Sequence, residues 1–225
     1  MSRPVRAALL LVLAGLGLGV AGCADDPSAA DRRADQVRDA AVDAGLPEDV
    51  ADVLALAARG IDGTYQVTYA GEDGAALVVS QAPPDRRIDV VAGDRIVESR
   101  VFRDEVAYEC TVPEDDPEGP LDCRRSQGAL QAPGAFTDES LATFAADLAE
   151  SRDDLDLSVE SRTVAGVEST CLVAVPRAGP TDGTGPGVET ICLSDEGGQL
   201  LIDAAGERLV AEAYTTDVPD GTFET

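Results

Sequence analysis

The sequence contains no histidine, lysine, tryptophan or asparagine, and aromatic residues make up only 4% of it. Without histidine a Ser–His nucleophile pair is excluded, and without lysine its Ser–Lys variant is excluded too. The scarcity of aromatic rings leaves no stacking platform for bases or sugars. The formal net charge of −26 argues against binding to nucleic acid or to an anionic membrane surface. We therefore expect an acidic, non-catalytic protein without a nucleic-acid partner.

Long apolar runs are also scarce, and the main one lies close to the N-terminus. It covers residues 7–20 and follows two positive charges, Arg3 and Arg6. A run of this length is too short to span a bilayer comfortably and is typical of the apolar core of a signal peptide. We therefore predict a signal peptide over residues 1–22.

The apolar run ends in the sequence VAGC at residues 20–23, which has the pattern of a bacterial lipobox. In a lipobox, small residues precede the cleavage site and the cysteine thiol carries diacylglycerol as a thioether. We predict lipidation at Cys23 and a hydrated tether over residues 23–31, which would anchor the exported chain to the outer face of the cytoplasmic membrane. The alternative is an ordinary secretory signal in which Cys23 is incidental.

Four further cysteines remain, an even number that suits two disulfides in an exported domain. They are Cys110, Cys123, Cys171 and Cys192. Sequential pairing is favoured because each pair brackets a predicted strand–loop–strand unit, and each disulfide would contribute about 3 kcal/mol in the chain-entropy model. A four-thiolate metal site is the alternative, and it is disfavoured because C-x-x-C motifs and histidine are absent. We expect no metal and no cofactor.

Paired carboxylates keep glycoside hydrolysis and calcium binding open as alternatives, for example at residues 114–116, 153–154 and 195–196. These acids fall in predicted loops and helix ends, where solvation is the ordinary role. No D-x-[DN]-x-[DN]-G calcium loop occurs either. The acidic clusters therefore predict a solvated surface and no catalytic residue.

Helical spacing of apolar residues predicts helices over residues 31–44 and 47–59, with Gly45 as a C-cap and Gly60 as the stop of the second. A third helix is expected to begin with Asp138 as its cap. Elsewhere apolar and polar residues alternate with period two, which is typical of half-buried antiparallel strands. The predicted strands cover residues 64–69, 76–81, 87–91, 95–102, 106–110, 157–164, 170–175, 188–193, 199–203 and 208–216.

The lipobox and several strand segments together resemble the LolA-like half-barrel lipoproteins, of the mycobacterial LppX and LprG type, with many actinobacterial relatives. The segments are GTYQVTY at 63–69, SQAPPDRRIDVV at 80–91, VAGVESTCLV at 164–173, ICLSDEGGQLLI at 191–202 and AYTTDVPDGTF at 213–223. The resemblance implies an α+β fold. In it, a strongly curved antiparallel sheet of about ten strands forms a half-barrel with helices on its concave face. Residues 32–225 would form this single domain.

The resemblance further implies a protein that holds a hydrophobic molecule, such as an envelope lipid, on the concave face. We expect this protein to be a monomer. The residues expected to line that wall are Tyr65, Val67, Tyr69, Leu77, Val79, Ile88, Val90, Leu141, Phe144 and Leu148. Each of these residues is equally suited to a plain core. The alternative function is therefore an envelope module with a filled core, which recognises a protein or the cell wall through its acidic surface.

Overall fold

In the computed structural model, the described residues are 28–71, 74–103, 106–126, 136–177, 189–204 and 207–224. The predicted signal peptide, the predicted lipobox and Cys23 lie outside these ranges. Within them, the chain forms the three helices α1 (Ala29–Asp43), α2 (Glu48–Asp62) and α3 (Asp138–Ser151). None of these three helices has the length and apolar character needed to cross a membrane.

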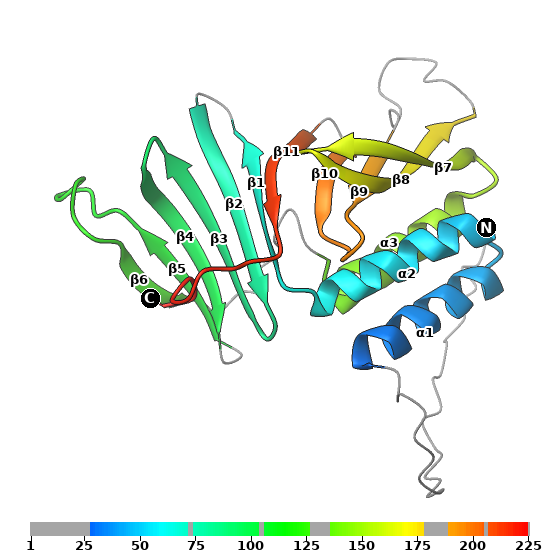
Figure 1. Ribbon diagram of the computed structural model, residues 1–225, viewed down its shortest axis with the longest axis horizontal. Coiled ribbons are helices and arrows are strands. Elements are labelled where there is room, and N and C mark those ends of the chain that lie inside the picture. Colours follow the sequence, from blue (N-terminus) through cyan, green and yellow to red (C-terminus); the bar gives the residue numbers. More distant parts are fainter. Residues whose placement is uncertain are drawn as a thin grey trace, which may run out of the picture.

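Eleven strands in the described ranges form one antiparallel sheet (Figure 1). They are β1 (Tyr65–Ala70), β2 (Ala75–Ala82), β3 (Asp85–Ala92), β4 (Arg95–Arg103), β5 (Val106–Thr111), β6 (Asp122–Ser126), β7 (Leu155–Val164), β8 (Val167–Pro176), β9 (Glu189–Leu193), β10 (Gln199–Ala204) and β11 (Glu207–Thr215). Their order across the sheet is β6-β5-β4-β3-β2-β1-β11-β10-β9-β8-β7. The sheet therefore consists of two meanders, the first formed by β1–β6 and the second by β7–β11. They meet where β1 pairs with β11. The ten predicted strands are present, and β6 is additional.

Several helix ends differ from the predictions. Helix α1 begins at Ala29, two residues earlier than predicted, and its C-cap is Ala44, one residue before Gly45. Helix α2 begins at Glu48, with Pro47 as its N-cap.

Helix α3 is capped by Thr137, whose hydroxyl accepts from the backbone N–H of Ser140 in a capping box, and Asp138 is the first residue inside the helix. Helix α2 continues through Gly60 to Asp62. The prediction that Gly60 ends this helix is therefore wrong. Gly60 lies instead where the β9–β10 turn touches the helix, and a side chain has no room there.

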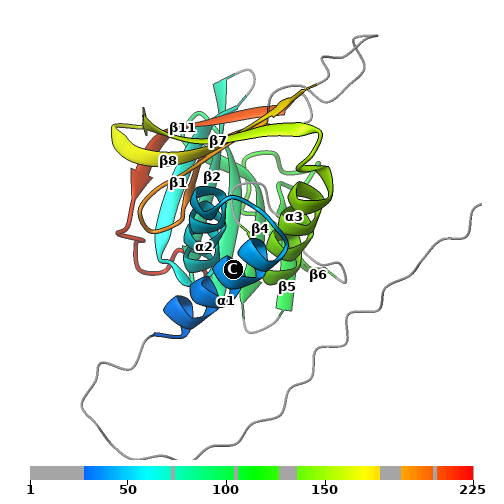
Figure 2. The same cartoon turned by 90° about the vertical axis from the view of Figure 1, so that its right-hand side faces the viewer.

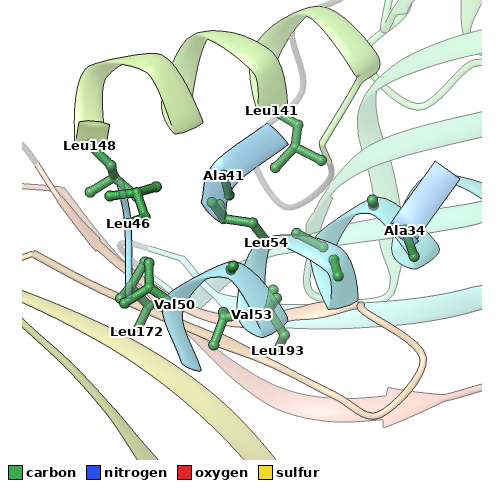
Figure 3. Packing of buried hydrophobic residues seen from close by; sticks show 14 residues of the cluster. Ala34, Ala41, Leu46, Val50, Val53, Leu54, Leu141, Leu148, Leu172 and Leu193 are labelled. Atoms are coloured by element: carbon green, nitrogen blue, oxygen red, sulfur yellow. The ribbon is translucent and has the colours of Figure 1, made fainter. Parts of the chain in front are cut away.

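The first hydrophobic core lies between the helices and the second meander (Figure 3). Helix α2 is its centre, because it packs against α1, α3 and strands β7–β9. Val50 and Leu54 of α2 are almost completely buried, as are Leu141 of α3 and Leu193 of β9. Most of the apolar surface of the helices is thus buried against one another and against half of the sheet.

The second core joins the two meanders, and its centre is the apolar face of β1. Tyr65, Val67 and Tyr69 are each at most 1% exposed and pack with residues of both meanders. Burial raises the pKa of Tyr65 to about 12, so its phenol stays protonated at neutral pH. The hydroxyl of Tyr69 donates to the carbonyl of Gln199 at 2.5 Å. This bond ties the first meander to the second.

The prediction of a strongly curved half-barrel is wrong. The sheet is open, broad and comparatively flat, with free edges at β6 and β7. The physical reason lies in the helix contacts, because α2 packs mainly on strands β7–β9 and is otherwise covered largely by α1 and α3. The helices therefore form their own layer over one half of the sheet, and the sheet does not need to wrap around them.

The C-terminal tail is attached to the face of β3 opposite α3. The guanidinium of Arg87 donates from Nη1 to the carbonyls of Thr222 and Glu224, at 2.9 and 3.1 Å. Nε of the same side chain binds the carboxylate of Asp89 at 2.7 Å. Figure 1 shows the tail crossing the strands toward β5 and β6. This contact fixes the end of the chain on the sheet.

Two disulfides cross-link neighbouring strands, and they join the pairs that the sequence favoured. Cys110 of β5 is bonded to Cys123 of β6, and Cys171 of β8 is bonded to Cys192 of β9. In each pair the two residues are direct partners in the strand register. Disulfides of this kind form and persist in oxidising compartments, so they indicate an extracytoplasmic location.

Candidate functional site

A cleft of about 1120 Å³ lies between α3 and strands β2–β4. Helix α3 packs on α2, and α2 lies over the second meander. The cleft arises because α3 therefore projects over the first meander without packing closely on it. In Figure 2, α2 and α3 lie side by side in front of β2 and β4. The C-terminal end of α2 and the β2–β3 turn at Pro83 and Pro84 complete the wall. The volume lies slightly above the range of about 300–1,000 Å³ that is typical of small-molecule sites.

The apolar part of the cleft comes from side chains of both the sheet and the helices. Ile88 of β3 and Phe102 of β4 stand on the sheet side, and Phe144 stands on the α3 side. The ring of Phe144 packs against Phe136, with 5.8 Å between the ring centroids. The full apolar set is Ile61, Pro83, Pro84, Ile88, Phe102 and Phe144.

Charged side chains slightly outnumber apolar ones in the lining. They are Asp62, Asp85, Arg86, Arg100, Asp138, Glu139 and Asp147. Arg33 of α1 forms ion pairs with Asp62 and Asp138, and the hydrogen bond to Asp62 is the main cause of its raised pKa. The exposed acids Asp138, Glu139 and Asp147 form an acidic rim along α3.

The polar base of the cleft is a network centred on Gln81, a residue of β2 that is 1% exposed. Its Nε2 donates to the carbonyls of Gly60, Ile61 and Gly63, at 2.5, 3.1 and 3.0 Å, where α2 ends. Its Oε1 accepts two hydrogen bonds from Arg86, from Nε at 2.9 Å and from Nη2 at 2.6 Å. Gln81 therefore joins the end of α2 to the guanidinium of Arg86.

Arg86 lies partly buried in the lining of the cleft, and desolvation lowers its pKa. Besides Gln81, its Nη2 donates to the carbonyl of Phe136 at 3.2 Å. Both acceptors are neutral. Arg100, the other cation of the lining, is exposed and pairs with Glu98 at 3.1 Å.

The ten wall residues predicted from the sequence divide into three groups. Ile88 and Phe144 line the cleft. Leu77 and Val90 are half-buried on the sheet. The other six are buried in the two cores: Tyr65, Val67, Tyr69, Val79, Leu141 and Leu148.

Sequence reasoning missed the polar members of the site, above all Gln81 and Arg86. The signal was present in the segment SQAPPDRR at residues 80–87, where a glutamine and an arginine stand on either side of a proline turn. In the strand register Gln81 and Arg86 are direct partners across β2 and β3, so both face the cleft. Phe102 is the register partner of Arg86 on β4 and was missed for the same reason.

A chain of hydroxyl groups lies outside the cleft. Ser194 donates to the hydroxyl of Tyr214 at 2.9 Å, and Tyr214 donates to Glu196 at 2.9 Å. The Ser194 hydroxyl also accepts from the backbone N–H of Gly198 at 3.1 Å, and Ser194 is fully buried. Burial is the main cause of the raised pKa of Tyr214, so its phenol stays protonated. Across the described ranges, no cluster of three or more acids or thiols suits a metal ion.

No protein-family model matches the chain, and no curated protein is similar to it. Among solved structures, a crystal structure of MucB in complex with MucA(peri) is similar at 19% sequence identity, with a TM-score of 0.41. The alignment covers 72% of this chain and 54% of that chain, so this chain spans about half the length of that structure.

Proposed function

We propose that this protein is an exported, non-catalytic binding protein that holds an extended segment of a partner protein in the cleft beside α3. The observation that carries the proposal is the composition of the lining, in which seven charged side chains accompany six apolar ones. A peptide offers apolar side chains, charged side chains and backbone polar groups within a few residues. Its chemistry therefore matches each part of this cleft.

The same lining argues against an acyl chain as the ligand. A lipid tail would have to lie against Asp85, Arg86 and the rim acids, and removing those groups from water without a partner is costly. A purely apolar tunnel, which would favour a lipid, is not what these residues form. A peptide segment with complementary charges avoids that cost.

The proposal also includes a lipid anchor at Cys23, which would hold the binding domain at the membrane surface. Replacing Cys23 with alanine is expected to move the protein from the membrane fraction to the soluble fraction, because the acyl chains would be lost. Fractionation followed by immunoblotting measures this. An Ala24→Ser variant, which keeps the thiol, is the matched control and should stay in the membrane fraction. Equal retention of the Cys23→Ala protein would contradict the anchor.

The proposed role of the cleft in peptide binding is tested by placing a large side chain in it. Thr143 of α3 is exposed and lines the cleft, so Thr143→Trp should occupy the space with little effect on the core. We expect this variant to bind at least about tenfold more weakly to short synthetic peptides selected from a random library on the wild-type protein, a difference of about 1.4 kcal/mol. Fluorescence anisotropy of labelled peptides measures the affinity.

The neighbouring residue supplies the control for this experiment. Ala142 is exposed on the same helix but does not line the cleft, so Ala142→Trp should leave peptide affinity unchanged. If both tryptophan variants bind as well as the wild type, the peptides bind elsewhere and the proposed site is wrong. If the library yields no binding peptide, the proposed function itself fails.

A further inference from the structure

Among the residues that the structure describes, Arg86 is a partly buried cation without an anionic partner, in a protein of net charge −26. Its hydrogen bonds go to the side-chain carbonyl of Gln81 and the backbone carbonyl of Phe136, through Nε and Nη2. Among the described residues, Nη1 has no hydrogen-bond partner and no carboxylate forms an ion pair with this guanidinium. Its charge is therefore compensated only by neutral dipoles.

None of the other charged side chains described in the cleft forms an ion pair with Arg86. Asp62 and Asp138 are occupied by Arg33, and the remaining acids of α3 stand exposed on the rim. Asp85, the chain neighbour of Arg86, also lines the cleft but forms no ion pair with its guanidinium. A buried charge that lacks a counter-ion is costly, and a charge-assisted hydrogen bond from a guanidinium to a carboxylate is stronger than one to a neutral acceptor. The cleft thus presents one unsatisfied positive group at its base and a negative rim at its mouth.

We infer that Arg86 is the anchor for a carboxylate of the bound peptide, and that basic residues of the same peptide face the acidic rim of α3. The inference rests on the proposed function and specifies the chemistry of the partner. The carboxylate belongs either to the C-terminus of the segment or to an internal aspartate or glutamate. A guanidinium held by two neutral acceptors keeps Nη1 available for either group.

The test measures the coupling between Arg86 and the peptide carboxylate. Peptides selected from the library are synthesised in three forms: unchanged, with a C-terminal amide, and with each acidic side chain replaced by its amide. Binding of each form to the purified full-length wild type, Arg86→Met and Arg86→Lys is measured by fluorescence anisotropy. We expect Arg86→Met to weaken binding of the unchanged form about ten- to hundredfold, with Arg86→Lys less affected.

The decisive result is the double-mutant cycle. If Arg86 contacts the carboxylate, one of the two neutralised forms will bind the wild type more weakly than the unchanged peptide does. That same form will bind Arg86→Met and the wild type with almost equal affinity. The form that shows this behaviour identifies whether the carboxylate is terminal or internal. The measurements on the wild-type protein do not depend on whether any variant folds. Equal affinity of all three peptide forms for the wild type would overturn the inference.

The remaining outcomes separate this inference from the function on which it rests. If Arg86→Met weakens acidic and neutral forms equally, Arg86 only supports the structure around Gln81, and the carboxylate anchor is overturned while the peptide site stands. If no peptide binds but dodecanoate does, a lipid occupies the cleft and both proposals fail. The Thr143→Trp variant distinguishes these cases, because it should block every ligand of the cleft.

Discussion

Replacing Gly60 with alanine is expected to lower the free energy of unfolding by about 3 kcal/mol. Helix propensity alone predicts the opposite sign, because alanine is the better helix former by about 1 kcal/mol. A Cβ at Gly60 would lie 2.2 Å from the carbonyl oxygen of Gly197 and 2.6 Å from its carbonyl carbon. Both atoms belong to the backbone of the β9–β10 turn, so neither can swing aside as a side chain would.

Gly197, on the turn, is packed just as closely against the backbone of α2. Its φ is +80°, and a Cβ there would lie 2.3 Å from the carbonyl oxygen of Leu56 in α2. Relief of the Gly60→Ala clash would therefore have to move the whole turn away from the helix. That movement would disturb Ser194 and Leu193, which are fully buried next to the turn.

Urea unfolding of the wild type and the Gly60→Ala variant measures this effect. Gly93→Ala is the matched control, because Gly93 has a φ of +65° and a Cβ there would have no neighbour within 4 Å. The control should cost only about 1 kcal/mol, from backbone strain alone. A Gly60→Ala protein as stable as the wild type would show that the contact between turn and helix is loose.

The second large effect is expected from removal of the Cys171–Cys192 disulfide. Its loss in a Cys171→Ala/Cys192→Ala variant should cost about 3 kcal/mol for a sequence separation of 21 residues. Both cysteines are fully buried and belong to the second core, so lost packing should add about 1 kcal/mol more.

The first disulfide supplies an internal comparison for the second. Cys110 and Cys123 are 13 residues apart, so the chain-entropy contribution is also about 3 kcal/mol. Cys123, however, lies on the edge strand β6 and is only half-buried. The Cys110→Ala/Cys123→Ala variant should therefore be more stable than the Cys171→Ala/Cys192→Ala variant in urea unfolding. The reverse order would contradict the burial argument.

Local structure was largely predictable from the sequence, because it depends on residue periodicity. The alternation of apolar and polar residues identified ten strands, but not β6. That strand has the sequence DCRRS and offers no apolar alternation. Gly60 was interpreted as a helix stop because glycine commonly ends helices. Its real role depends on Gly197, a residue far along the chain that no local pattern reveals.

The curvature of the sheet and the cleft were not predictable, because both depend on where the helices pack. Tyr65, Val67 and Ile88 share one apolar pattern in the sequence. All three belong to the second core, but Ile88 also lines the cleft. The difference arises from the position of α3, which covers the first meander only loosely. Arg86 was missed because an arginine in a strand is ordinarily interpreted as a solvent-facing residue.

The pairing of β1 with β11 has a consequence for the order in which the chain folds. Gln66 is the register partner of Thr215, so the centre of the sheet is closed by residues from opposite ends of the domain. Each meander can form from local hairpins, but the two halves join only after the last strand is available. Contacts of such long sequence separation slow folding. The edge of β1 would therefore stay unpaired until β11 is available.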